Sequence, residues 1–103
     1  MAEFLFVYHG GGQTPPEDAE AAIAAWGKWF SDVGACVVDA GKPVGVSTTV
    51  MSDGSVVSDG GSNAATGYGI FSAESLDAAV AIAKGCPMLA DGGSVEIAEM
   101  FDP

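Results

Sequence analysis

The sequence holds a single histidine, His9, and its position is the first feature that suggests chemistry. His9 follows an apolar run, residues 4–8, and precedes three glycines, so it stands where a strand would open into a flexible loop. Histidine is the side chain best able to exchange a proton near neutral pH. We therefore treat His9 as a candidate acid/base residue, and a hydrogen-bonded structural histidine is the alternative.

Two aspartates, Asp59 and Asp91, are each followed by two glycines. Glycine lets the backbone turn tightly, so either residue can present its carboxylate from a turn. Either could pair with His9 for acid/base work or bind a cation, and plain turn formation is the alternative. The spacing of a metal cage is missing, because there is one histidine and no calcium-loop pattern. We predict no metal and no cofactor.

Aromatic side chains could form the walls of a pocket for a small, largely apolar or neutral molecule. Helical spacing favours a core position for Trp26 and Phe30, whereas Trp29 and Tyr68 are candidates for a pocket between helix and sheet. The candidate binding residues are Tyr8, Trp26, Trp29, Tyr68 and Asp91.

The charge balance excludes several classes of partner. Fourteen acidic residues face three lysines and no arginine, for a net charge of -11. Nucleic-acid binding depends on cations that neutralise phosphates, so we expect no nucleic-acid partner and no anionic membrane partner. No apolar run reaches the roughly 18–20 residues that span a bilayer, and no basic residues precede the first apolar stretch. We expect a cytoplasmic protein in which Cys36 and Cys86 are free thiols.

These residues need elements to position them, and the pattern predicts seven segments in order. Apolar periodicity and end signals mark the helices: Thr14 with Glu17 reads as a capping box, and Ser75 reads as an N-cap. We expect Pro87 to block any continuation of the second helix. The predicted segments are a strand over 3–9, a helix over 15–33, a short strand over 36–39, a hairpin of 44–51 with 55–58, a strand over 67–72, a helix over 76–84 and a strand over 93–101.

The order predicts one α+β domain, residues 1–103, with a ferredoxin-like βαββαβ arrangement and an extra short strand or hairpin. Two helices can cover only one face of its antiparallel sheet. Both faces of the first strand are apolar, so the second face also needs a cover. The simplest cover is another copy of the same sheet, and we therefore expect a homodimer.

The order of several short motifs resembles the YCII-related family, also called the DGPF-domain family. The motifs are Ala40-Gly41, Asp59-Gly60, Gly67-Tyr68, Ser75-Leu76-Asp77-Ala78-Ala79, Ala83-Lys84-Gly85-Cys86-Pro87 and Gly92-Gly93-Ser94-Val95-Glu96. The resemblance covers almost the whole chain and implies a single YCII-like domain that assembles as a dimeric α+β barrel. Most members have no assigned reaction. Some are thought to be enzymes with a histidine on the first helix and an aspartate just before the proline after the second.

This chain departs from that pattern at three places. Residues 24–26 contain no histidine, Cys86 stands before Pro87, and Gly61-Ser62 replaces the usual Pro-Phe after the Asp-Gly motif. Our first hypothesis is a YCII-like protein of uncharacterised function with a small-molecule pocket. If it is an enzyme, of lyase or isomerase type, His9 acts as acid/base while Asp59 and Tyr68 orient the substrate. The alternative is a non-catalytic binding or accessory module that acts through a homodimer or a partner protein.

Overall fold

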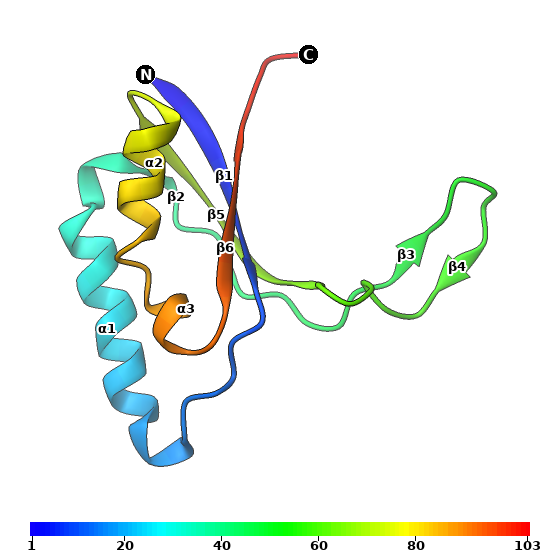
Figure 1. Cartoon of the computed structure of the whole chain (residues 1–103), viewed down its shortest axis with the longest axis horizontal. Helices are drawn as coiled ribbons and strands as arrows, with labels where there is room; N and C mark the ends of the chain where they lie inside the picture. Colours follow the sequence, from blue (N-terminus) through cyan, green and yellow to red (C-terminus); the bar gives the residue numbers. More distant parts are fainter.

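A four-stranded antiparallel sheet organises the chain, and the computed structural model describes all of residues 1–103. Its strands are β1 (Ala2–His9), β2 (Val37–Asp39), β5 (Ala65–Ala73) and β6 (Ser94–Glu99). They lie in the order β2-β5-β1-β6, and β1 pairs with both β5 and β6. This is the predicted ferredoxin-like α+β arrangement, with β1 as an inner strand (Figure 1).

The helices lie on one face of the sheet (Figure 1). A 3₁₀ turn (Pro16–Asp18) leads into α1 (Ala19–Asp32), and a second 3₁₀ turn (Gly34–Cys36) leads into β2. After β5 comes α2 (Leu76–Ala83), whose N-cap is Ser75 as predicted: its hydroxyl accepts the Ala78 N–H at 3.1 Å. The short helix α3 (Pro87–Ala90) was not predicted. Pro87 does not only block α2, because proline fits the first turn of a new helix.

The capping box predicted at Thr14 and Glu17 is wrong. The 3₁₀ turn at Pro16 has no side-chain cap. The Thr14 hydroxyl instead donates to Asp91 Oδ1 at 2.5 Å, across a sequence separation of 77 residues. A hydrogen bond donated to a carboxylate is stronger than one accepted from a backbone N–H, and it decides where this hydroxyl points.

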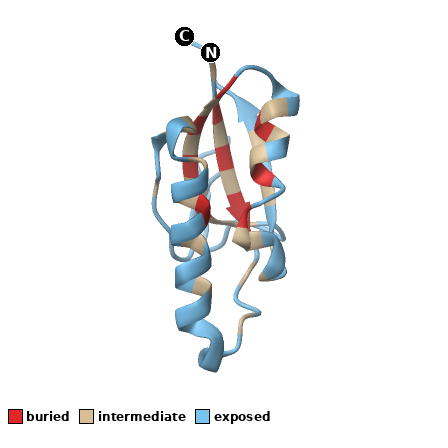
Figure 2. Cartoon of the chain, turned by 90° about the vertical axis from the view of Figure 1, so that its left-hand side faces the viewer, coloured by how far each residue is buried: buried red, intermediate tan, exposed pale blue.

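The core follows from the period-two alternation of β1. Phe4, Phe6 and Tyr8 point toward the helices and are buried, whereas Leu5 and Val7 face the other way and are half-buried. Buried and half-buried stretches alternate along the central strand (Figure 2). Phe6 stacks on Phe71 of β5 with ring centroids 4.3 Å apart. Trp29 of α1 and the small residues Ala79 and Ala83 of α2 complete the buried cluster. Each large apolar side chain buried here contributes roughly 1.5–3 kcal/mol to folding.

A two-stranded arm projects from the sheet on the side away from the helices (Figure 1). We use the name arm for residues 44–63, which include β3 (Thr49–Val50) and β4 (Val56–Val57). The two strands pair only with each other. The hairpin was predicted around its Ser-Asp-Gly turn, and the carboxylate of Asp53 accepts the Ser55 N–H there. The paired part is shorter than predicted.

The second face of the sheet carries no helix. We call it the open face. Residues paired directly across antiparallel strands share a face, so Leu5 with Ile70 and Val7 with Tyr68 lie on it. The molecule is therefore thin, with extents of 44 × 41 × 18 Å. None of its helices combines the length and apolar character needed to cross a membrane.

The turn after β2 depends on one glycine. Gly41 has a φ of +72°, and a Cβ there would lie 1.7 Å from the Tyr68 carbonyl oxygen. We expect Gly41→Ala to lower the free energy of unfolding by about 3 kcal/mol or more, because both the backbone conformation and β5 must shift. Urea denaturation measures this loss.

Gly45→Ala is the matched control, because nothing lies within 4 Å of a Cβ at that position. Its effect should stay within about 0.5 kcal/mol. Equal losses in the two variants would contradict the close approach of Gly41 to β5.

Candidate ligand-binding site

A pocket of about 400 Å³ opens where the arm leaves the sheet. One wall comes from α1 through Ile23, Trp26 and Phe30. The opposite wall is the segment 40–43 after β2 together with the first residues of β5. Tyr8 of β1 forms part of the floor, and the lining is mostly apolar. These features are those of a small-molecule site.

The Tyr8 ring lies against two glycines of the neighbouring strand. A Cβ on Gly67 would be 3.1 Å from Tyr8 Cδ2, and one on Gly69 would be 3.3 Å from the Tyr8 hydroxyl. Any larger residue at these positions would press on the ring. On its other side, Trp26 meets Tyr8 in a T-shaped contact with centroids 5.3 Å apart. The sequence therefore holds Tyr8 in one orientation.

The Tyr8 hydroxyl is a buried polar group without a hydrogen-bond partner. The residue is only 5% exposed. Burial raises the pKa of this phenol well above its usual value, so the group stays a neutral donor at ordinary pH. Nearly all buried polar groups in folded proteins are paired, so this unpaired hydroxyl is an exception, and its oxygen atom is covered by protein atoms.

Lys42 is the one cationic residue of the pocket lining. Of the three lysines, Lys28 is engaged by Asp32 at 2.7 Å, whereas Lys42 is in neither ion pair of the structure. Its backbone is fixed, because its carbonyl accepts the Tyr68 N–H at 3.2 Å. The pocket thus combines apolar walls, one neutral donor and one free cation.

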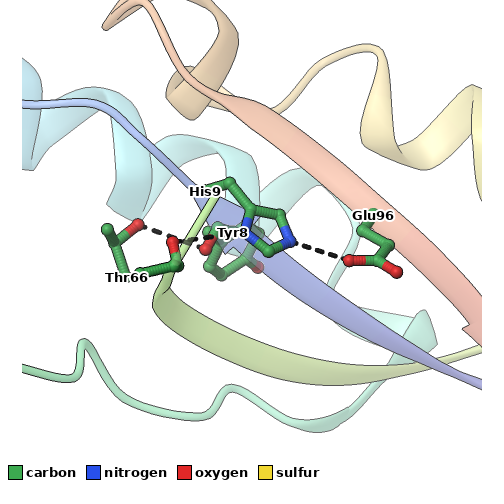
Figure 3. Close-up of polar contacts among 5 residues, drawn as sticks. Tyr8, His9, Thr66 and Glu96 are labelled. Carbon is green, nitrogen blue, oxygen red and sulfur yellow. Dashed lines mark hydrogen bonds and ion pairs between the residues drawn. The ribbon is translucent and has the colours of Figure 1, made fainter. Parts of the chain in front are cut away.

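His9 is buried and pairs with Glu96 of β6, a residue that the sequence interpretation missed. Its Nε2 lies 2.8 Å from Glu96 Oε1, and its Nδ1 lies 3.2 Å from the Ala64 carbonyl oxygen (Figure 3). Both partners are acceptors, so the imidazole satisfies both only when each nitrogen carries a proton. The hydrogen bond to Glu96 raises the pKa of His9 above 6.5. The one sequence signal for Glu96 is the alternation along the predicted strand 93–101, which places its side chain on a definite face of the sheet.

His9 and Tyr8 are neighbours in β1 and therefore point to opposite faces of the sheet. His9 is not part of the pocket lining. The Thr66 hydroxyl donates a hydrogen bond to the Tyr8 carbonyl oxygen at 3.2 Å, near the end of β1 (Figure 3). The acid/base candidate and the pocket thus lie on different sides of β1.

The two candidate aspartates form no hydrogen bond with His9. Asp59 is exposed on the arm, where its Oδ1 accepts the Gly61 N–H at 2.9 Å in a local turn. Asp91 fastens the glycine loop after β1: it accepts the N–H groups of Gly12 and Thr14 at 2.8 and 2.6 Å, as well as the Thr14 hydroxyl. These bonds, the Thr14 hydroxyl first, lower the pKa of Asp91.

The two tryptophans exchange the positions that helical spacing indicated. Trp29 is buried in the core, and its indole N–H donates to the Ile82 carbonyl oxygen at 3.1 Å. Trp26, one turn earlier, is half-buried and lines the pocket with Phe30. Tyr68 also borders the pocket, but by its pairing with Val7 its side chain belongs to the open face.

The two cysteines are free thiols, as predicted. Cys86 is buried, and burial raises its pKa to about 11. It therefore stays protonated near neutral pH and packs as a small apolar residue, because the thiolate is the reactive form.

Comparison with solved structures finds a likeness in fold over almost the whole chain. No family profile matches this chain, and no curated protein sequence matches it. A solved structure with this likeness is 5-chloro-2-hydroxyhydroquinone dehydrochlorinase (TftG) from Burkholderia phenoliruptrix AC1100, in complex with 2,5-dihydroxybenzoquinone. It is 18% identical, with a TM-score of 0.57, over 98% of this chain and 95% of that one. The likeness supports the ferredoxin-like α+β fold over the whole chain.

Proposed function

We propose that the pocket between α1 and the segment 40–43 binds a small planar molecule that carries oxygen substituents, such as a hydroxylated quinone. The observation that carries this proposal is the Tyr8 hydroxyl, which is buried in the pocket wall without a partner. A ligand carbonyl oxygen would accept a hydrogen bond from it after a small shift of the atoms that cover the hydroxyl. The ligand of the structurally similar dehydrochlorinase, 2,5-dihydroxybenzoquinone, belongs to this chemical class.

The pocket walls suit a flat ring. Trp26 and Phe30 present aromatic surface, and their ring centroids lie 5.9 Å apart. Aromatic rings interact well with another ring in stacked or edge-on geometry. A volume of about 400 Å³ holds a single substituted ring with space for a few waters.

Lys42 favours a ligand with one ionised oxygen. The chain carries a net charge of -11, which repels anions in general. A free ammonium at the pocket offsets this repulsion locally. A hydroxyquinone, which is acidic and has neutral carbonyl groups beside its ionised oxygen, would engage both Lys42 and Tyr8.

The contacts support binding better than catalysis. In the catalytic form of the proposal, of lyase or isomerase type, His9 moves the proton and Asp59 assists. Yet both nitrogens of His9 are occupied, its carboxylate partner is Glu96, and it lies outside the pocket lining. Asp59 is engaged in a turn of the arm. A non-catalytic binding module fits these contacts. We propose a cytoplasmic location for it.

We also propose that the protein is a YCII-like homodimer. The open face of the sheet exposes apolar residues of β1 and β5 that no helix covers. A second copy placed on this face would bury them, as the two-layer rule for domains requires.

Tyr8→Phe separates binding from folding. Removing an unpaired buried hydroxyl should raise the free energy of unfolding by about 1 kcal/mol, because its desolvation cost disappears. The same change should weaken binding of 2,5-dihydroxybenzoquinone about two- to tenfold, since one hydrogen bond is lost. Thermal denaturation and titration calorimetry measure the two effects. Ser52→Ala removes an exposed hydroxyl outside the pocket lining; it is the control and should leave binding unchanged. A destabilised Tyr8→Phe would contradict the unpaired state of the Tyr8 hydroxyl.

Lys42→Gln tests charge recognition. Affinity for anionic 2,5-dihydroxybenzoquinone should fall about two- to fivefold, and added salt should shrink the difference because exposed ion pairs are screened. Affinity for neutral 2,5-dimethoxybenzoquinone should stay the same. Lys84→Gln, outside the pocket, is the control. An equal loss for both quinones would argue against an ionic contact.

His9 predicts a pH dependence with a definite sign. Its pKa is raised in the folded state, so its bond to Glu96 stabilises fully below about pH 6 and is lost as pH rises through the raised value. Between pH 5.5 and 9, wild-type stability should therefore fall more than that of His9→Gln or Glu96→Gln. Chemical denaturation across this range measures the slopes, and parallel slopes would count against the pair.

The same His9→Gln variant decides between the two forms of the proposal. If His9 serves only the structure, the folded variant keeps its affinity for 2,5-dihydroxybenzoquinone. If His9 contacts the ligand, that affinity is lost while the fold remains.

A further inference from the structure

We propose that the arm packs against a second copy of this chain and that this contact fixes the position of the wall of the ligand pocket. The inference rests on the homodimer of the proposed function and adds the element that holds it. In this contact, the apolar surface of residues 44–57 of one copy packs against the open face of the other.

The chain exposes more surface than a compact monomer of its size. Its accessible area is 6652 Å², whereas a 10.3 kDa monomer typically exposes about 5,400 Å². The excess of roughly 1,300 Å² exceeds the ~800 Å² that each partner buries in a standard interface. The radius of gyration is 14.9 Å, against about 13 Å for a compact domain of this length. A second copy would bury the excess.

The arm has the composition of a contact surface. Val46, Val50 and Val56 are 93%, 70% and 64% exposed, and Val50 pairs directly with Val56 on one side of the hairpin. An isolated two-stranded ribbon is marginally stable in water. This ribbon has only two paired residues in each strand and packs on no helix. Packing on another molecule would stabilise it.

The charges favour a copy of the same chain as occupant. The arm contains no lysine, and its only charged residues are Asp53 and Asp59, which are engaged in turns. A basic partner would find few acids there, and an acidic partner would find no cations. The open face carries the apolar Leu5, Val7 and Ile70, with the His9–Glu96 pair beside them, where Glu96 lies directly opposite Val7. The uncharged valines of the arm can pack on the apolar residues of the open face, although each chain carries a net charge of -11.

The geometry allows reciprocal contact. The arm projects on the side of the sheet that the helices leave free, so the arm and the open face border the same space (Figure 1). In a two-fold dimer the same patch serves both copies, and each arm would reach the other copy's open face. The two arms and the two open faces of the dimer thereby form two identical contacts.

The root of the arm is also the wall of the pocket. The Val44 N–H donates to the Thr66 carbonyl oxygen at 3.0 Å, and Pro43 bridges to Gly67. Thr66, Gly67 and the segment 42–43 all line the pocket. On the other side, His9 holds the Ala64 carbonyl oxygen. A change in the position of the arm therefore also changes the pocket wall, because backbone hydrogen bonds connect the two.

Sedimentation velocity at micromolar concentration tests the contact between the arm and the second copy. Wild type should sediment as a dimer, and the double variant Val46→Asp with Val50→Asp should have a dimer Kd at least tenfold higher. The control is Leu76→Asp, which adds an acid at another exposed apolar site, at the start of α2. Far-UV circular dichroism checks that all three proteins are folded.

Hydrogen exchange tests the link to the pocket without any ligand. The amides of Val44 and Tyr68, which close the root, should exchange at least threefold faster in the double variant than in Leu76→Asp. A monomeric wild type overturns both the homodimer and the inference. A double variant that stays dimeric, or unchanged exchange at the root, overturns the inference and leaves the homodimer of the proposed function standing.

Discussion

The alternation of side chains along β1 is the constraint on which the rest of the structure depends. Because successive residues of a strand point to opposite faces, Tyr8 faces the helices and His9 faces the other way. A shift of one residue in the register would exchange the two faces. The strand therefore divides the chemistry of the chain: a neutral donor lines the pocket, and the proton-exchanging group ties the open side of the sheet to Glu96.

The sequence predicts well those features that depend on neighbouring residues. The strand around residues 3–9, the long first helix and the Ser75 cap follow from local spacing and end signals, and the structure confirms them. The strand order follows too, because few topologies satisfy short connections between such elements. Local rules fail where a distant group competes. The Thr14 hydroxyl, which was expected to cap the first helix, instead donates a hydrogen bond to Asp91.

The candidate site was less accessible to sequence reasoning, because its contacts join distant segments. Nothing local relates Tyr8 to Gly67 and Gly69, yet the missing Cβ atoms of these glycines make room for the ring. The Glu96 partner of His9 lies 87 residues away. Trp26 and Trp29 could not be told apart by helical spacing. Contacts with distant segments, the Ile82 carbonyl of α2 and the Phe71 ring of β5, place Trp29 in the core.

The unpaired Tyr8 hydroxyl shows how stability and binding are opposed in this fold. A phenylalanine would fill the same space without the cost of a buried unpaired donor, so the free chain gains nothing in stability from the hydroxyl. Binding sites commonly retain groups that are unfavourable until the ligand arrives. The surrounding residues hold the group ready, with Trp26 on one side and the glycines of β5 on the other. The ring cannot turn away to find water, so in the proposed function the hydroxyl gains a partner only when a bound ligand displaces the atoms that cover it.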